Sequence, residues 1–149
     1  MTVEWVLIGA FVGALSAFIF NFILWKISQK SSKRDATRKI LLDTLEVALE
    51  EAVEYWSGSL SRNSSKKILC EAKLKLFVKA QTTFIDNFTS DFSSRLTASN
   101  RTMLDNFKIE AFELVTGGQF ESPVCKDLNR CKQIALKYTK AILIIKRCS

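Results

Sequence analysis

Histidine is absent from the 149 residues of this chain, proline occurs once and glycine only five times. Without histidine, the commonest general base and the commonest metal ligand are both missing, so most histidine-dependent catalysis is excluded. The scarcity of proline and glycine, together with 48% hydrophobic residues, excludes a disordered, collagen-like or low-complexity chain. The length is that of one domain, and the apolar side chains suffice for a core.

Motifs of the common enzyme classes are absent as well. The sequence contains no GxxxxGK[ST] or GxGxxG phosphate loop, no GxSxG nucleophile elbow and no pair of carboxylates at a catalytic spacing. Its four cysteines, Cys70, Cys125, Cys131 and Cys148, have no histidine to activate them and do not follow the spacing of a zinc site. We therefore expect a protein that is not an enzyme and that uses no metal or cofactor.

Charge is lacking from Trp5 to Trp25, a run of 21 residues. About 20 apolar residues span the hydrocarbon core of a bilayer, and tryptophan favours its two interfaces. A cleaved signal peptide is disfavoured because Glu4 precedes the run without a basic residue and no small-residue cleavage site follows. A buried helix of a soluble protein is rarely apolar on every face. The run predicts one transmembrane helix, with an anchor over residues 1–28 and a helical domain over residues 29–149.

The residues after this run indicate its orientation. Residues 26–39 carry six basic side chains against one acidic residue, Asp35: Lys26, Lys30, Lys33, Arg34, Arg38 and Lys39. The positive-inside rule then places the N-terminus outside and residues 26–149 in the cytoplasm, as a single-pass protein of the cell inner membrane. A second, compatible interpretation is that the same residues attract anionic lipid headgroups.

One stripe of the predicted membrane helix carries small and polar residues. Gly9, Gly13, Ala17 and Asn21 are four residues apart and so share a face. A GxxxG pair lets two helices approach closely, and an asparagine amide in lipid gains from a hydrogen bond to a partner helix. Self-association through this stripe is one interpretation. The other is that glycine is common in membrane helices and that Asn21 reaches interfacial water.

The remaining residues repeat their apolar side chains with helical periodicity and show no strand-like alternation. We expect an all-α fold, in which one N-terminal transmembrane helix precedes a cytoplasmic bundle of about four helices. Helices are predicted over residues 35–56, over residues 66–88, from Ser99 or Asn100 to Gly117–Gly118, and from Ser122–Pro123 onward. The first of these can continue the membrane helix, because neither glycine nor proline separates them.

Each predicted helix has an apolar stripe that should face the core. The expected buried positions are Leu42, Leu45, Leu49, Ala52 and Trp56; then Leu69, Lys73, Leu76, Ala80, Phe84 and Phe88, widened by Phe77 and Ile85; then Met103, Leu104, Phe107, Ala111 and Leu114; and finally Leu128, Cys131, Ile134, Ala135, Tyr138, Ile142 and Ile145. The run from Ala141 to Ile145 is too short to cross a bilayer and is expected in the core.

Charge is divided into blocks along the chain. Residues 43–56 hold five acidic side chains and no basic one, whereas residues 62–79 hold six basic and residues 123–149 seven, each with one acidic residue. An acidic helix packed beside basic helices is the simplest explanation. A basic surface for nucleic acid, lipid or an acidic partner is the alternative, although no defined nucleic-acid module is present.

The segment Leu114–Ser122, LVTGGQFES, lies ahead of Pro123 at the end of a predicted helix. With the single anchor and the basic stretch after it, this layout resembles small single-pass inner-membrane proteins of bacteria. Some of these resemble effectors of retron-type antiphage defence systems, which are encoded beside a reverse transcriptase and its noncoding RNA. The resemblance implies a toxic membrane effector that is held inactive until infection, and it assigns no site residues. A glycine C-cap explains the same segment structurally.

Two classes of function therefore stay open. The first is a membrane-anchored effector that perturbs the inner membrane under the control of a cytoplasmic protein or protein–nucleic-acid partner. The second is a benign membrane-tethered adaptor or scaffold, whose helical module binds protein or nucleic acid. In both, the lipid bilayer is a partner and the anchor is available for self-association.

Overall fold

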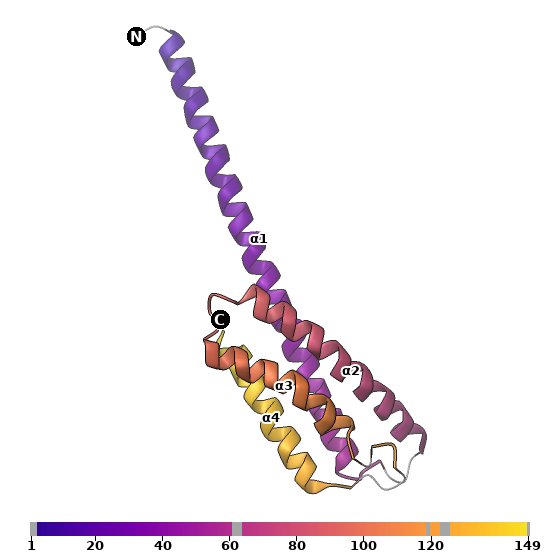
Figure 1. Ribbon diagram of the computed structural model, residues 1–149. Helices are drawn as coiled ribbons and strands as arrows, with labels where there is room; N and C mark the ends of the chain where they lie inside the picture. Colours follow the sequence, from indigo (N-terminus) through magenta and orange to yellow (C-terminus); the bar gives the residue numbers. More distant parts are fainter. Residues whose placement is uncertain (1–2, 61–63, 119, 123–125, 149) are drawn as a thin grey trace. The chain divides into compact units, whose positions relative to one another are not determined.

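The computed structural model describes residues 3–60, 64–118, 120–122 and 126–148, with side chains from Gly13 onward except that of Ser64. The protein is all-α, and its four helices form a bundle-like arrangement (Figure 1). Their bounds are α1 Val3–Trp56, α2 Ser64–Asp91, α3 Ala98–Thr116 and α4 Leu128–Arg147. The N-terminal helix continues into the helix over residues 35–56, as the sequence allows, since α1 is unbroken.

The chain divides into two compact units, Met1–Ala36 and Thr37–Ser149. The described part of the first unit is helical throughout and belongs to α1. The second unit comprises the remainder of α1 together with α2, α3 and α4.

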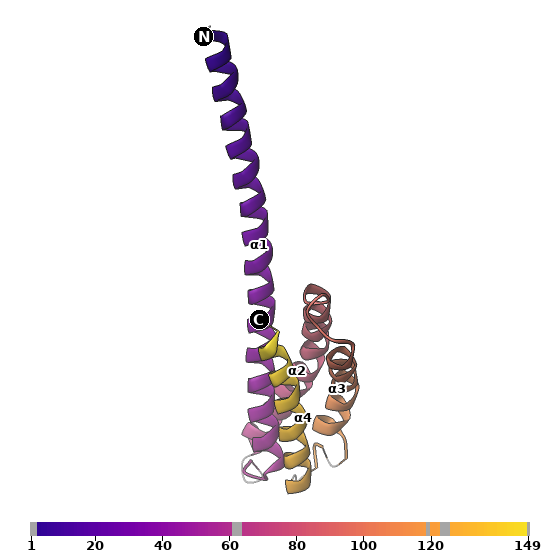
Figure 2. The ribbon, with the colours of Figure 1, turned by 90° about the vertical axis from the view of Figure 1, so that its left-hand side faces the viewer.

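In the second unit the helices run alternately up and down, and each is antiparallel to the next (Figures 1 and 2). The end of α1 lies against both α2 and α4. The Cys70 thiol of α2 lies 3.5 Å from the carbonyl oxygen of Glu51 in α1, and the Cys131 thiol of α4 lies 3.8 Å from the carbonyl oxygen of Val53 in α1. Helix α3 packs against α2 and α4. Short connections between successive helices favour this topology, because they leave antiparallel neighbours side by side.

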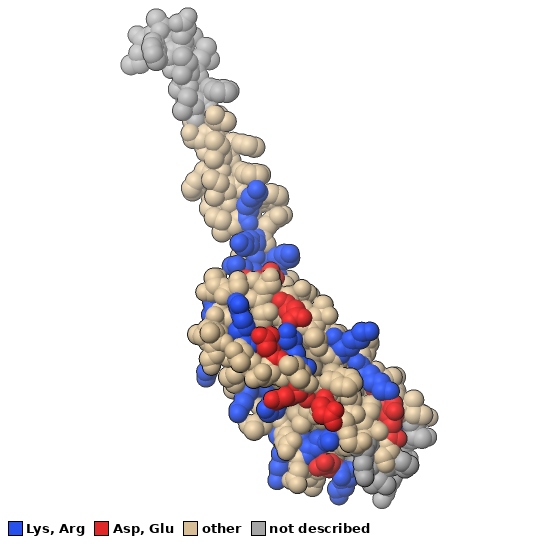
Figure 3. All heavy atoms as spheres, in the orientation of Figure 1, with Lys and Arg blue, Asp and Glu red and all other residues tan. Residues whose placement is uncertain are grey.

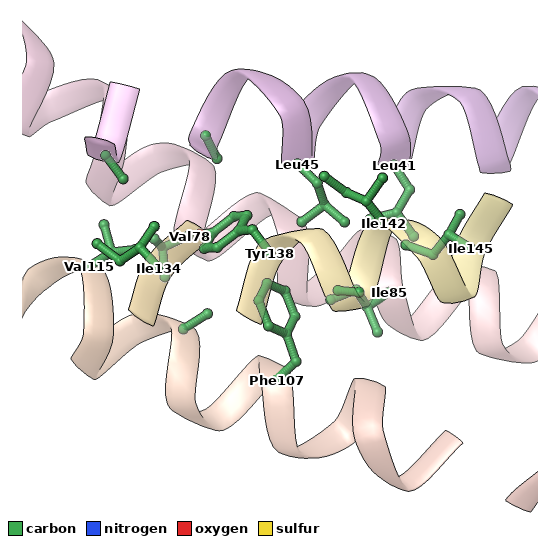
Figure 4. Close-up of a cluster of buried hydrophobic side chains, with 14 of the residues drawn as sticks. Leu41, Leu45, Val78, Ile85, Phe107, Val115, Ile134, Tyr138, Ile142 and Ile145 are labelled. Atoms are coloured by element: carbon green, nitrogen blue, oxygen red, sulfur yellow. The ribbon is translucent and has the colours of Figure 1, made fainter. Parts of the chain in front are cut away.

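The core lies along the axis of this bundle and receives side chains from all four helices. Figure 4 shows Leu41 and Leu45 of α1 pointing toward Ile142 and Ile145 of α4. All four are buried. Of the apolar run near the C-terminus, Ala141, Ile142, Ile144 and Ile145 are buried, which confirms the expectation that this run belongs to the core.

The predicted buried face of α2 was wrong in its first half, whereas Ile85 and Phe88 are buried as expected. Leu69 and Leu76 are 58% and 66% exposed, and Cys70, Leu74, Val78 and Gln81 are buried in place of the predicted positions. These positions repeat every three or four residues, as a core stripe should. The stripe contains a thiol and an amide, so it is less apolar than an ordinary core face, and the neighbouring leucines obscure it in the sequence.

The other helices show smaller departures from the predicted stripes. Met103 of α3 and Leu128 of α4 are exposed rather than buried, and Val115 takes the core position that was assigned to Leu114. In α1 the buried stripe is Leu41, Leu45, Ala48, Ala52, Tyr55 and Trp56, so Leu42 and Leu49 lie at its edge.

Helix α3 begins and ends at capping residues. Its N-cap is Thr97, whose hydroxyl accepts a hydrogen bond from the Asn100 amide, so the prediction of Ser99 or Asn100 was wrong by two to three residues. Its end at Gly117 is confirmed: the Gly117 amide donates to the Glu113 carbonyl at 2.8 Å, and Gly118 follows with a φ of 67°. A positive φ is adopted without strain by glycine, which has no Cβ.

Helix α4 begins later than Ser122–Pro123. Its N-cap is Asp127, whose carboxylate accepts from the Arg130 amide at 2.9 Å. An aspartate at this position satisfies one of the free amides of the first turn. Ser122 precedes the helix, and Pro123 lies outside the described residues.

Ion pairs join the acidic part of α1 to the basic helices. Lys73 of α2 lies 2.5 Å from Glu51, and Lys146 of α4 lies 2.8 Å from Glu46. The expected packing of an acidic helix beside basic ones is therefore confirmed.

Candidate functional site

The most unusual surface of the described chain is the apolar segment of α1 in the first unit. Nine large hydrophobic side chains there are between 45% and 68% exposed. They are Leu15, Phe18, Ile19, Phe20, Phe22, Ile23, Leu24, Trp25 and Ile27. Soluble proteins rarely leave so large a contiguous apolar surface uncovered. This segment is the leading candidate for a functional surface.

Across the described residues, we find no helix whose apolar stretch is long enough to cross a membrane. The prediction of a transmembrane helix concerns Trp5 to Trp25, and the side chains from Trp5 to Val12 lie outside the described ones. It therefore stays a prediction.

Aromatic side chains follow one another along the described part of this segment. The Phe18 and Phe22 rings stack with centroids 6.5 Å apart, and the Trp25 ring lies 6.0 Å from that of Phe22. The Lys26 ammonium lies 5.0 Å from the centroid of the Phe22 ring. A cation that folds back along an apolar stem in this way is typical of a side chain at an apolar–polar boundary.

The stripe of small residues lies on α1 and is open to the surroundings within the first unit. Gly13, Ala17 and Asn21 are exposed, and a Cβ added at Gly13 meets no atom within 4 Å. Gly9 is in the helical backbone, but its surroundings lie outside the described side chains. The helical spacing places the three described positions on one face, where a second helix can approach closely.

The predicted basic residues are divided between the two units. Lys26, Lys30, Lys33 and Arg34 belong to the first unit, where blue side chains follow the tan apolar stretch in Figure 3. Arg38, which is half-buried, and Lys39, which is exposed, belong to the second unit. The fold therefore assigns these last two residues to the bundle itself.

Sequence reasoning missed basic residues that the fold brings to the same end of the bundle as Arg38. Arg38 and Arg95 both lie close enough to Cys148 to favour its thiolate, although burial outweighs them and raises the pKa of this thiol. Arg95 lies in the connection between α2 and α3, and Arg147 is in the last turn of α4. If the helices are assumed to run up and down, the ends of neighbouring helices coincide, and this assumption would have placed Arg38, Arg95 and Arg147 at one end of the bundle.

Two of the grooves on the described surface of the bundle expose large apolar side chains. One lies between α3 and α4, where Leu114, Arg130 and Leu136 contribute to its lining. The other lies between α2 and α3 and is lined by Phe112, Phe120 and polar side chains that include Lys79. Leu136 and Phe112 are 56% and 59% exposed, so both grooves offer apolar surface to a partner.

The three cysteine thiols that the structure describes, those of Cys70, Cys131 and Cys148, are not poised for nucleophilic chemistry. Burial, assisted by Glu51, raises the pKa of Cys70 from 9.0 to about 12. Burial also raises the pKa of Cys131 and of Cys148. A thiol must become a thiolate to react, so these environments favour the inert form. Among the described residues, no group of three potential ligands could hold a metal ion.

The segment Leu114–Ser122 is accounted for by packing. The Arg130 guanidinium donates to the Gly117 carbonyl at 2.5 Å and lies 4.5 Å from the Trp56 ring. Phe120 packs on Tyr55 with ring centroids 5.0 Å apart, and the Tyr55 hydroxyl accepts from the Glu121 amide at 2.8 Å. The turn thus closes one end of the bundle by contacts to α1 and α4.

Comparison with known proteins identifies no relative: no protein family, curated protein or solved structure matches the chain.

Proposed function

We propose that this chain is a membrane-anchored, non-enzymatic effector, in which Trp5–Trp25 is a single bilayer-spanning helix and residues 26–149 lie in the cytoplasm. The observation that carries the proposal is the exposed apolar surface from Leu15 to Ile27. Removing one such large side chain from water is worth about 1.5–3 kcal/mol, and a bilayer covers all of them together. The basic residues from Lys26 onward then face the cytoplasmic surface.

The acting part of this effector is the anchor. Its stripe of Gly13, Ala17 and Asn21 is exposed in the first unit, so copies of the helix can associate there. Several copies are needed to perturb the membrane, because one crossing with a single amide lines no aqueous path. The bundle binds a cytoplasmic protein or protein–nucleic-acid partner that holds the effector inactive, as the resemblance to retron-type antiphage effectors implies.

The test is controlled expression of the full chain in a bacterium, with growth and membrane potential followed together. We expect arrested growth and depolarisation in the parent. A Gly9→Leu/Gly13→Leu variant should keep its potential, because leucine prevents close helix approach. A matched Ala10→Leu/Ala14→Leu variant enlarges two small residues on a neighbouring face and should still depolarise. Normal growth of the parent, with the protein shown in the membrane, would overturn the effector proposal.

A second function is favoured by the two apolar grooves of the bundle, which fit an adaptor that concentrates a binding module at the membrane. Replacing residues 1–25 with an unrelated transmembrane helix distinguishes the two functions. An adaptor keeps its partner binding and its cellular effect after the exchange. An effector that acts through its anchor loses the effect.

A further inference from the structure

The end of the bundle at which α1 enters the second unit is strongly basic. It is built from the start of the second unit, the α2–α3 connection, the first turn of α3 and the last turn of α4. We name this surface the basic end and define it by six residues: Arg38, Lys39, Arg95, Arg101, Lys146 and Arg147. Arg38 is half-buried and the other five are exposed.

Contacts between these elements show that the residues share one end. The Thr37 hydroxyl donates to the Asp91 carboxylate at 3.1 Å, which joins α1 to the end of α2. Arg38 and Arg95 both act electrostatically on Cys148, which joins them to the end of α4. Arg101 donates to the Ser93 carbonyl at 3.4 Å, and both ribbon views place the C-terminal end of α4 beside α1 here (Figures 1 and 2).

The two ends of the bundle differ in charge. At the basic end, residues 37–40, 91–101 and 146–148 contain six basic side chains and one acidic one, Asp91. At the opposite end, the described residues among 54–60, 65–67, 117–122 and 126–128 contain three of each sign. Among the described residues of the two ends, the excess of positive charge lies at the end from which the chain continues toward Trp25.

Little of this charge is neutralised within the fold. Lys146 pairs with Glu46, and the Asp91 carboxylate accepts from Thr37. Within the part of the chain that the structure describes, Arg38, Lys39, Arg95 and Arg147 form no ion pair with a carboxylate. Four uncompensated cations on one small surface attract an anionic partner.

We propose that the basic end docks onto the anionic lipid headgroups of the bilayer that the N-terminal segment enters, an inference that rests on the proposed membrane anchoring. Only eleven residues separate Trp25 from Thr37. Even fully extended, these eleven residues keep the basic end within about 40 Å of the membrane interface. The basic end therefore experiences a high effective concentration of lipid headgroups. A nucleic acid in solution has no such advantage.

The strength of docking should follow the number of charges and the salt concentration. Each basic side chain near an anionic membrane changes the docking equilibrium about fivefold. Removal of two therefore weakens docking by about 30-fold. At 0.5 M salt the interaction should be largely screened, because the Debye length is already about 10 Å at 0.1 M.

The test uses the full chain in lipid nanodiscs of phosphatidylcholine, with or without phosphatidylglycerol, and measures amide hydrogen exchange over residues 92–97. We expect slower exchange in the anionic discs, with the protection lost at 0.5 M salt. An Arg95→Gln/Arg147→Gln variant should lose the protection. A charge-matched Lys79→Gln/Lys132→Gln variant should keep it, because both lysines are exposed and lie away from the basic end.

Each negative result of this experiment contradicts a different part of the proposal. Failure of the parent chain to enter neutral discs refutes the membrane anchoring itself. Entry into both kinds of disc with equal exchange over residues 92–97 refutes the docking alone. Equal loss of protection in both double variants shows that net charge, rather than the basic end, is responsible. Protection by added RNA that exceeds protection by anionic lipid assigns the surface to nucleic acid and overturns the proposal.

Discussion

The Tyr138 hydroxyl of α4 donates a hydrogen bond to Oε1 of Gln81 in α2, at 3.1 Å across the interior of the bundle. Both residues are fully buried, and Gln81 Nε2 has no partner among the described residues. Among the described residues, the Tyr138 hydroxyl is therefore the one hydrogen-bond partner of the Gln81 side chain. Burial of a polar group without a hydrogen bond is costly, so the pair is a point at which the core is sensitive to substitution.

Tyr138→Phe should lower the free energy of unfolding by about 1–3 kcal/mol, because it leaves the buried Gln81 amide without its one partner. The measurement is guanidinium unfolding of the full chain in detergent, followed by far-ultraviolet circular dichroism. A Gln81→Leu/Tyr138→Phe variant should recover most of the loss, because two apolar groups leave no buried polar atom unpaired. Unchanged stability of Tyr138→Phe would contradict this account of the core.

Arg130→Met should lower the free energy of unfolding by about 1–2 kcal/mol, since it removes both the contact with Trp56 and the hydrogen bond to the Gly117 carbonyl. Methionine keeps an apolar stem of similar reach. Lys132→Met, at an exposed position of the same helix, is the control and should change stability by less than about 0.5 kcal/mol. Equal effects of the two substitutions would mean that Arg130 does not stabilise the turn.

Cys70 should make stability depend on pH on the alkaline side. Its folded pKa of about 12 exceeds the ordinary value of 9.0, so the folded chain keeps a proton that the unfolded chain loses. The contribution of the protonated Cys70 thiol to the free energy of unfolding is complete below pH 9 and is lost as the pH rises toward 12. Denaturation curves between pH 7 and pH 11 should show a shallower decline for Cys70→Ala than for the parent.

Thiol labelling provides an independent check of the same residue. At pH 8 a thiol-specific reagent should modify Cys70 far more slowly in the folded chain than in the chain unfolded in guanidinium. The reason is that the reactive thiolate of Cys70 is scarce in the folded state. Labelling of Cys70 at the rate of the unfolded chain would show that burial does not hold its pKa high.

Glu46→Gln should change the free energy of unfolding by less than about 0.5 kcal/mol, although it breaks the ion pair with Lys146. Both side chains are about half exposed, so water and salt screen the attraction. Guanidinium unfolding at low and at high salt is the measurement. A loss above about 1.5 kcal/mol would indicate that this pair fastens α4 to α1 more strongly than a surface ion pair does.

Much of the fold could be predicted from the sequence where local signals agree. The unbroken α1 followed from the lack of glycine and proline between the apolar run and residues 35–56, and the end of α3 followed from Gly117–Gly118. The buried face of α2 was predicted only at Ile85 and Phe88, because Cys70 and Gln81 are poor markers of a core. The start of α4 was misplaced because Pro123 is a strong helix-start signal, whereas the helix uses Asp127 as its N-cap.

The candidate site was predicted only in part. The apolar segment, the small-residue stripe and the basic run are continuous in the sequence and could be recognised without a structure. The basic end has no such local signal, because Arg95 and Arg147 are 52 residues apart and reach the same end as Arg38 only through the up-and-down arrangement of the helices. A connection between helices carries no periodic pattern, so nothing local marks Arg95 as part of a surface.

The packing of Ile142 and Ile145 of α4 against Leu41 and Leu45 of α1 also fixes the order of events during synthesis (Figure 4). About 90 residues must be translated after α1 ends at Trp56 before these partners exist, which takes at least several seconds at about 5–20 residues per second. The N-terminal apolar segment emerges well before then. Under the proposed function, the chain enters the membrane first, and its bundle closes afterwards as the last helix is released.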